Sequence, residues 1–224
     1  MLLSTISHTV KGIAGILCVM EIKKFKHACV VLTKHSQSLV IDPGEWSTDF
    51  IPPENVVAVV VTHEHGDHFS LEHIASIMSK NPAAKIFVPK DLIERLKGFA
   101  TAIDVSGGQI IQVGDFTISF FGEQHATIHP DYPVCNNVGV LVDGGEFYYP
   151  GDSFTLPASK VKLLAVPAAA PWMKIAEAMD FVAAVQPEEF FAVHDAVLSP
   201  EGKMVADAWF ARTAEKTGSV YKKS

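Results

Sequence analysis

Four apolar, strand-like runs in this chain each end in a histidine or an aspartate. The runs are VVVTHEHGDH, ISFFGEQH, FYYPGD and FFAVH, and their polar ends fall at residues 63–68, 125, 152 and 194. Loops at strand ends are where a rigid sheet presents functional side chains. The pattern therefore predicts a sheet-based fold, and strand ends that share one edge would form one functional site.

The first half of the chain reads as strands followed by short helices. NVVAVVVT at 55–62 is a continuous β-branched run, which is typical of a strand covered on both faces. HACVVLT and SLVIDPG flank KHSQ and predict a hairpin. Ser70 can cap a helix that ends before Asn81-Pro82, and KIFVP and DLIERLKGF predict another strand and a short helix.

The second half of the chain repeats this order. Apolar runs predict strands at QIIQVG, FTISFFGE, NVGVLVDG, EFYYPGD, VKLLAVPA and EEFFAVH. Helices are predicted around WMKIAEAMDFVAAV and KMVADAWFARTAEKT, the second of them amphipathic. The simplest architecture is one α/β domain over residues 20–224, in which helices cover packed sheets.

Residues 1–19 are predicted to be an N-terminal extension ahead of this domain. They are moderately apolar, but His8 and Lys11 interrupt them, and no continuous apolar run approaches the ~20 residues that span a membrane. They also lack the basic start and the small-residue cleavage site of a secretory signal. We therefore expect no membrane partner.

Charge and cysteine content limit the partners and the compartment. The net charge is −7 and the lysines and arginines are scattered, whereas a nucleic-acid binder usually has a concentrated basic face. No nucleic acid is therefore expected as a partner. Three cysteines without a CxxC pair favour a reducing, cytoplasmic location. The expected partner is a small-molecule substrate, and a homo-oligomer is compatible with the sequence.

The HEHGDH cluster has the residue types and the spacing of a metal site. His63 and His65 are two residues apart, so in extended backbone both point to the same side. Gly66 is expected to let the chain turn and aim Asp67 and His68 elsewhere. Imidazole and carboxylate are the usual ligands of zinc and also suit iron or manganese. Two pairs aimed at different points favour a dinuclear site, whose metals lie about 3.5–4 Å apart.

The four strand ends together would supply seven ligands to such a site. The candidate metal ligands are His63, His65, Asp67, His68, His125, Asp152 and His194.

HEHGDH fits the H-x-H-x-D-H signature of the metallo-β-lactamase fold superfamily, and the later H, GD and H segments follow in its order. From about Met20 onward the chain resembles this superfamily. HACVVL, IDPG, NNVGVLVDG, PGDS and HDAVLS are similar to segments of its small metal-dependent hydrolases related to YtkL and to ascorbate-6-phosphate lactonase. The resemblance implies a four-layer αββα sandwich. It also implies one metal on His63, His65 and His125, a second on Asp67, His68 and His194, and Asp152 as the bridge.

Four further residues are candidates for supporting the site or lining its pocket. Asp42 in SLVIDPG either begins a turn or, as the matching acid does in the superfamily, supports the metal site from behind. His27 resembles a family position near the site, and a buried strand histidine fits as well. His129 and Asn137 follow His125, and either line the pocket or belong to an ordinary polar loop.

Other residues near the motifs have ordinary explanations. Glu64 alternates with the two histidines and is expected to face solvent. Trp172 is either a pocket wall or a core residue. Cys135 is expected to be a small filler, because bound metals would already supply the nucleophile.

These observations favour a dinuclear metal-dependent hydrolase that uses a metal-bound hydroxide on an ester-type bond. Asp67 is the catalytic candidate, because it would orient the hydroxide while it binds metal. The expected cofactor is two divalent metal ions, with zinc first and manganese or iron as alternatives. The substrate is expected to be a small anion, such as a lactone phosphate or a small phosphodiester. Two other hypotheses stay open, a diiron protein of redox or oxygen chemistry and a non-catalytic metal-binding module.

Overall fold

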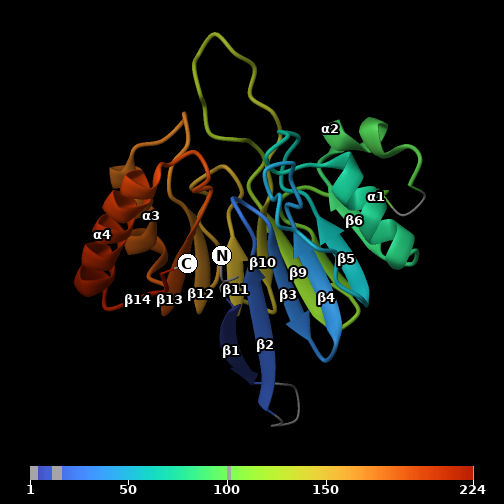
Figure 1. The fold of residues 1–224 in the computed structure, drawn as a ribbon, viewed down its shortest axis with the longest axis horizontal. Helices are drawn as coiled ribbons and strands as arrows, with labels where there is room; N and C mark the ends of the chain where they lie inside the picture. Colours follow the sequence, from blue (N-terminus) through green and yellow to red (C-terminus); the bar gives the residue numbers. More distant parts are fainter. Residues whose placement is uncertain (1–4, 12–16, 100–101, 224) are drawn as a thin grey trace. The chain divides into compact units, whose positions relative to one another are not determined.

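Two seven-stranded sheets and four α-helices form the part of the chain that the computed structural model describes, residues 5–11, 17–99 and 102–223. The chain divides into two compact units, the first made of residues 1–105 with 112–116 and the second of residues 106–111 with 117–224. The first unit contains the first sheet with α1 and α2, and the second contains α3, α4 and the second sheet apart from residues 112–116 (Figure 1).

The first sheet changes from antiparallel to parallel pairing at its fourth strand. Strands β1 to β4 pair antiparallel, and β4 to β7 pair parallel. Parallel neighbours need crossover connections. Residues 42–55 connect β4 to β5 without a helix, α1 connects β5 to β6, and α2 with a 3₁₀ turn at Glu94–Leu96 connects β6 to β7. The elements are β1 (Thr5–Lys11), β2 (Leu17–Lys24), β3 (Val30–Lys34), β4 (Gln37–Ile41), β5 (Val56–Val60), α1 (Leu71–Lys80), β6 (Lys85–Val88), α2 (Lys90–Ile93) and β7 (Ala102–Asp104).

Helix α1 packs its apolar stripe on the first sheet. Ile74 and Ile77 are fully buried in a cluster that includes Val59 of β5 and Ile86 of β6. The helix begins where the sequence predicts, because Ser70 Oγ accepts a hydrogen bond from the amide of the third helical residue at 3.3 Å. The packing on this face holds β5 in place, and β5 leads directly into HEHGDH.

The second sheet mirrors this change of pairing. Strands β9 to β11 pair antiparallel and β11 to β14 pair parallel. Residues 150–162 connect β11 to β12 without a helix, and α3 and α4 are the two later crossovers. Residues 112–116, which end β8 and begin β9, group with the first unit. The elements are β8 (Ile110–Val113), β9 (Phe116–Phe121), β10 (Gly139–Val142), β11 (Phe147–Tyr149), β12 (Leu163–Pro167), α3 (Ile175–Val185), β13 (Glu189–Val193), α4 (Pro200–Thr217) and β14 (Val220–Tyr221).

Aromatic side chains fill the core between the second sheet and its helices. Phe181 of α3 and Phe210 of α4 are buried in one cluster with Leu164 of β12 and Phe190 of β13. The rings of Phe190 and Phe210 meet edge to face, 5.8 Å between centroids. This core fixes β12 and β13, whose ends lead into the second group of predicted ligands.

The predicted strands and helices are present, and the predicted hairpin closes through His35 and Ser36. Their φ angles are +47° and +67°, as a tight two-residue hairpin turn requires. Strands β1 and β2 and the short strands β7 and β14 are additional to those predicted.

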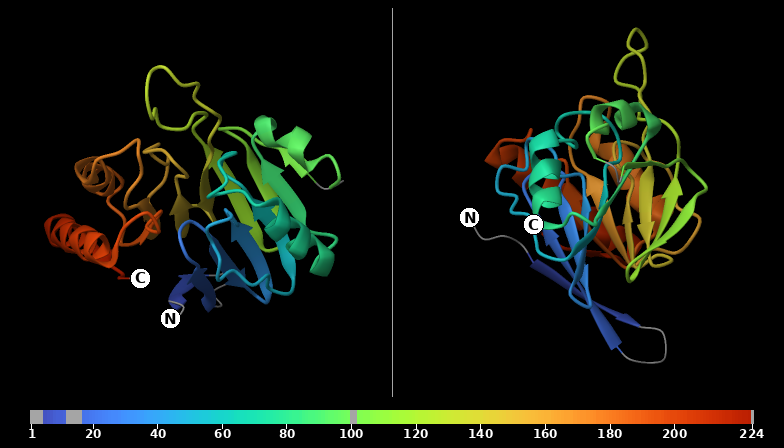
Figure 2. Two further views of the ribbon diagram at one scale, coloured as in Figure 1. Left: turned by 45° about the horizontal axis from the view of Figure 1, so that its top comes forward. Right: turned by 90° about the vertical axis from the view of Figure 1, so that its right-hand side faces the viewer.

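Part of the predicted N-terminal extension forms strands of the first sheet. Residues 5–11 pair antiparallel with residues 17–23, and the β1–β2 pair reaches past the ends of β3 and β4 (Figure 2). Residues 1–4 and 12–16 lie outside the described residues. A single domain that begins at residue 20 stays a prediction. In the described residues, no helix combines the length and the apolar character that crossing a membrane requires.

Candidate metal centre

The HEHGDH residues lie in a turn that follows β5, not on an extended strand. The backbone amides of His68 and Phe69 both donate to the carbonyl of His65, at 3.0 and 2.9 Å. The ring of His63 lies 4.8 Å from that of His65 and 4.1 Å from that of His68. Candidate ligand atoms of His63 lie within 4.8 Å of those of both other histidines. The turn therefore gathers the three imidazoles, although the strand alternation expected from their spacing is wrong.

The chain turns at residues 66–68, as expected, but this turn does not require a glycine at position 66. The φ of Gly66 is not in the left-handed region, and a Cβ there would meet only the flexible end of the Glu45 side chain, at 3.2 Å. The tight position is Gly44, where a Cβ would lie 1.9 Å from the carbonyl oxygen of Asp67. The turn after β4 therefore passes directly against the backbone of the ligand turn, and only glycine fits there.

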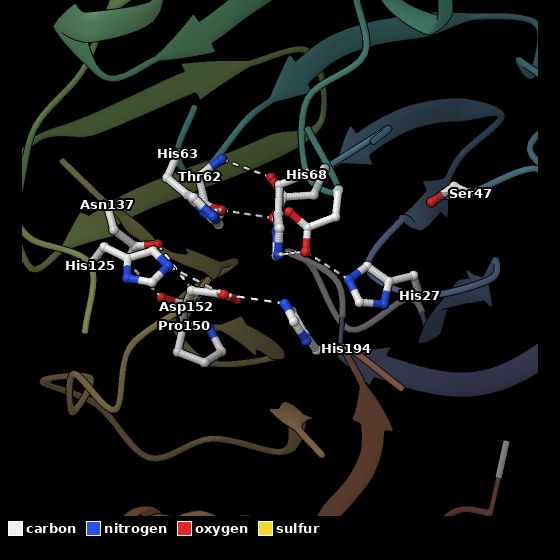
Figure 3. Close-up of polar contacts among 12 residues, drawn as sticks. His27, Ser47, Thr62, His63, His68, His125, Asn137, Pro150, Asp152 and His194 are labelled. Carbon is white, nitrogen blue, oxygen red and sulfur yellow. Dashed lines mark hydrogen bonds and ion pairs between the residues drawn. The ribbon is translucent and has the colours of Figure 1, made fainter. Parts of the chain in front are cut away.

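Asp42 connects the end of β4 to two of the predicted ligands. Its buried carboxylate accepts hydrogen bonds from the Thr62 amide at 2.7 Å, from Thr62 Oγ1 at 2.7 Å and from His68 Nδ1 at 2.6 Å (Figure 3). It also has a positive φ of +49°, which is uncommon outside glycine and tolerated by aspartate. Of the two interpretations of Asp42, these contacts favour support of the ligands from behind.

The same contacts decide which ring nitrogen of two histidines carries the proton. Thr62 Oγ1 donates its only proton to Asp42, so it can only accept from His63 Nδ1, 3.0 Å away. His68 Nδ1 likewise donates to Asp42. When these imidazoles are neutral, each Nε2 therefore carries a lone pair, as a metal ligand requires.

His27 contacts Asp67, the aspartate of the HEHGDH cluster. Its Nε2 lies 3.0 Å from Asp67 Oδ2 (Figure 3). Its ring lies 4.8 Å from the ring of Trp46. A carboxylate can only accept, so His27 donates.

Burial raises the pKa of the Cys29 thiol well above its usual value, with the charge of Asp42 adding to the effect. Cys29 is therefore held protonated and is unsuited to bind metal or to attack a substrate.

The second unit brings together its own three predicted ligands. Asp152 Oδ2 lies 3.3 Å from His125 Nε2 and 3.2 Å from His194 Nε2, and all three residues are buried (Figure 3). Asn137 Oδ1 accepts from the Asp152 amide at 3.0 Å, and its Nδ2 donates to the carbonyl of Pro150 at 3.0 Å. Asn137 thus holds the loop that carries Asp152.

Backbone carbonyls orient the two histidines of the second unit. His125 Nδ1 donates to the carbonyl of Ala126 at 2.5 Å, and His194 Nδ1 donates to the carbonyl of Ala169 at 2.7 Å. When these two imidazoles are neutral, each Nε2 again carries a lone pair, and both lone pairs face the Asp152 carboxylate. Lone pairs and a carboxylate that converge repel one another unless protons or a cation lie among them.

The structure places two residues, His129 and Trp172, for which the sequence allowed more than one role. His129 is exposed, and its contacts are with Asp131 and Tyr132 of its own loop. That loop, residues 126–136, stands out from its unit (Figures 1 and 2). Trp172 instead donates its indole N–H to Asp152 Oδ2 at 2.8 Å. The only sequence signal for this contact is the N–H itself, which needs a partner when the ring is buried.

A cavity of about 340 Å³ in the second unit is separate from the predicted ligands. None of the seven side chains lines it. Its walls come from the segment after β12 and from the start of α4, and they are Ala168, Ala169, Ala170, Met173, Ile175, Leu198, Gly202, Val205, Ala206 and Trp209.

The donor sets of both units fit a divalent metal by their chemistry. The first unit offers three imidazoles and one carboxylate, and the second offers two imidazoles and one carboxylate. Four of the five imidazoles have Nδ1 bound to an acceptor. In each of these four rings, Nε2 is therefore the nitrogen left to bind a metal. Such nitrogen and oxygen donors suit zinc, iron or manganese.

Comparison with known proteins places the chain in a family. Residues 21–194 match the model of the Beta-lactamase superfamily domain. Protein Rv0786c of Mycobacterium tuberculosis is 32% identical over 202 residues, which cover 88% of this chain and 93% of that protein. The UPF0173 metal-dependent hydrolase SSO0099 of Saccharolobus solfataricus is 25% identical over 146 residues, 59% of this chain and 61% of that protein.

A solved structure shows the same fold. It is a protein of Parabacteroides distasonis, provisionally named a metal-dependent hydrolase, with a TM-score of 0.77, 18% identity and 98% of both chains covered. The α/β class and the resemblance predicted from HEHGDH are thus confirmed. The chain belongs to the β-lactamase superfamily and has its metallo-β-lactamase fold.

Proposed function

We propose that this chain is a metal-dependent hydrolase whose seven predicted ligands together hold two divalent metal ions, with zinc as the first expectation. The observation that carries the proposal is the orientation of the imidazoles. His63, His68, His125 and His194 each commit Nδ1 to a hydrogen-bond acceptor, which leaves Nε2 as the metal-binding atom. The relatives named metal-dependent hydrolases support the same activity.

The two carboxylates of the set have different surroundings and therefore different proposed roles. Asp67 is partly exposed and receives a hydrogen bond from His27, so it is the residue that can reach both a bound water and a substrate. Asp152 is buried and receives a hydrogen bond from Trp172, which suits a bridging ligand held in one orientation. When bound, two divalent ions would supply hydroxide at neutral pH and stabilise an oxyanion in the transition state.

The charge of the proposed set favours a small anionic ester as substrate. Two divalent ions bring four positive charges, whereas Asp67, Asp152 and a hydroxide together bring three negative ones. Asp42, which contacts His68, offsets part of this surplus. We therefore expect a modest preference for anions such as lactone phosphates or small phosphodiesters. The net charge of −7 on the chain opposes long polyanions.

The proposal is tested by loading the metal-free protein with zinc, manganese or iron and screening lactones, phosphodiesters, thioesters and β-lactams. Asp67→Ala and His125→Ala are expected to abolish turnover and to keep the far-ultraviolet circular dichroism of the wild type, because the apolar cores lie away from these side chains. His35→Leu is the matched control, since His35 also contacts an aspartate but is exposed. Full activity of either alanine variant would refute the role of that residue.

Matched neutral and anionic esters test the substrate class. The anionic member should have the higher kcat/KM at low salt, and the difference should shrink at high salt because salt screens the attraction. A higher kcat/KM for the neutral member at both salt concentrations contradicts the charge argument. A coloured, iron-loaded protein that consumes oxygen and hydrolyses nothing in the screen would favour the diiron alternative instead.

A further inference from the structure

The loop between β12 and α3, residues 168–173, contacts every predicted ligand of the second unit. The carbonyl of Ala169 accepts from His194 Nδ1 at 2.7 Å, and Trp172 Nε1 donates to Asp152 Oδ2 at 2.8 Å. The Trp172 ring also meets that of His125 edge to face, 6.0 Å between centroids. One short segment therefore sets the orientation of three side chains that are far apart in the sequence.

The first end of this 168–173 loop is tied to a strand, and a turn within the loop closes its other end. The amide of Ala168 donates to the carbonyl of Val193 at 2.9 Å and so continues the pairing of β12 with β13. At the other end, the amide of Met173 donates to the carbonyl of Ala170 at 3.3 Å, just before α3 begins. The loop is thus a fixed support for the ligands.

Aromatic packing holds the indole of Trp172 against this support. The ring of Phe154 lies 5.1 Å from that of Trp172 and 5.2 Å from that of Phe181, which belongs to α3. These three rings form a continuous row of contacts from the helix to Trp172, with the first pair tilted and the second edge to face. The position of the indole N–H is therefore set by the core of the second unit and not by Asp152 alone.

The indole differs chemically from the other groups around Asp152. His125 and His194 face the same carboxylate oxygen through Nε2. The indole is a donor only and keeps its proton at every physiological pH. The two imidazoles differ from it, because each neutral ring commits its proton to a backbone carbonyl through Nδ1 and has none on Nε2.

We infer that Trp172 is a positioning residue, which holds Asp152 through its indole N–H and thereby sets the metal affinity of the site. The inference rests on the proposed function, because it assigns Asp152 to the metal set. Residues that orient metal ligands in this way typically contribute about 10–100-fold to metal affinity. The competing explanation is that Trp172 only fills space between Phe154 and His125.

Trp172→Phe separates these explanations, because phenylalanine keeps an aromatic ring and lacks the N–H. Metal-free wild type, W172F and the control W209F are titrated with Co²⁺ and Zn²⁺ against a chromophoric chelator. Trp209 is a suitable control because it is 39% exposed on α4. We expect W172F to bind about 10-fold more weakly or worse and to show an altered Co²⁺ absorption spectrum, whereas W209F stays within twofold of wild type.

A measurement on the wild type makes the test independent of how W172F folds. The chain has three tryptophans, and the other two, Trp46 and Trp209, are 44% and 39% exposed. In proton NMR the Trp172 indole N–H should exchange more slowly with solvent than the other two and should shift on metal binding. Single Trp→Phe variants assign the three signals.

Two results would overturn the inference. One is W172F with wild-type affinity and an unchanged Co²⁺ spectrum, and the other is a Trp172 indole N–H that exchanges as fast as those of Trp46 and Trp209. A wild-type protein that binds no metal would instead overturn the proposed function. The two failures are therefore distinguishable in one set of titrations.

Discussion

His27 has a backbone conformation that costs energy for a bulky side chain. Its φ of +70° lies in the left-handed region, where non-glycine residues are strained by about 1–3 kcal/mol. The turn around it is closed by the Phe25 amide, which donates to the carbonyl of Cys29 at 2.9 Å. Its buried side chain donates to Asp67. Strain of this kind persists only where the surrounding structure holds the residue in place, and it often marks a functional site. We therefore propose that His27 holds Asp67.

At the residue scale, His27→Leu should weaken metal binding about 10–100-fold, because it removes the N–H that orients Asp67. His27→Gln keeps an N–H donor and should recover part of the loss. Metal titration of the folded variants measures both effects.

The control for His27 is again His35→Leu. His35 has a φ of +47° and lies 3.2 Å from Asp115, so it matches the strain and the contact, but its side chain is 57% exposed. Metal affinity equal to wild type in His27→Leu, with a lower melting temperature, would show that His27 is only structural.

At the element scale, the site depends on how closely the turn after β4 approaches the turn after β5. Gly44 lies where these two segments meet, and the Gly44 amide donates to the Asp42 carbonyl at 2.8 Å. The amide of Glu45 donates to the carbonyl of Gly66 at 2.8 Å, which ties the two turns together. The contacts between Asp42 and His68 follow from this approach.

Gly44→Ala should therefore destabilise the fold by about 1–3 kcal/mol or more and also weaken metal binding, because the added methyl overlaps the carbonyl of Asp67. Gly98→Ala is the control, since a Cβ there meets nothing within 4 Å. Urea unfolding of the metal-free proteins and metal titration measure the two effects. A Gly44→Ala protein as stable as Gly98→Ala would contradict the close approach.

At the scale of the whole molecule, the predicted ligands are divided between two compact units. Under the proposed function, metal ions bound by ligands of both units stabilise both units together. Binding to the native state at a metal concentration of 100 times Kd contributes about 2.7 kcal/mol per site, which raises Tm by about 5–11 °C for a chain of this size.

Hydrogen exchange measured by mass spectrometry checks this coupling, because it reports each unit separately. Zinc should slow exchange in β5 of the first unit and in β13 of the second, and a chelator should reverse both changes. Elemental analysis should find close to two metal ions per chain. Protection limited to one unit, or one metal ion at saturation, would contradict a shared dinuclear set.

The amino-acid sequence by itself determined the strands and the chemistry of the ligands. Apolar runs such as VVAVV and EFFAV form strands because burying them is favourable wherever they pair, and the polar residues that end them are adjacent in the chain. The short strands β7 and β14 are different, because two or three residues form a strand only beside an existing sheet edge.

Only the tertiary structure decided what orients the ligands. Asp42 meets His68, Ala169 meets His194 and Trp172 meets Asp152 across separations of 26, 25 and 20 residues. A local sequence pattern does not indicate such partners, because every residue has a backbone carbonyl and every tryptophan has an indole N–H, whatever these groups contact. The same holds for Gly44, whose need for glycine comes from a chain segment 23 residues away and not from its own turn.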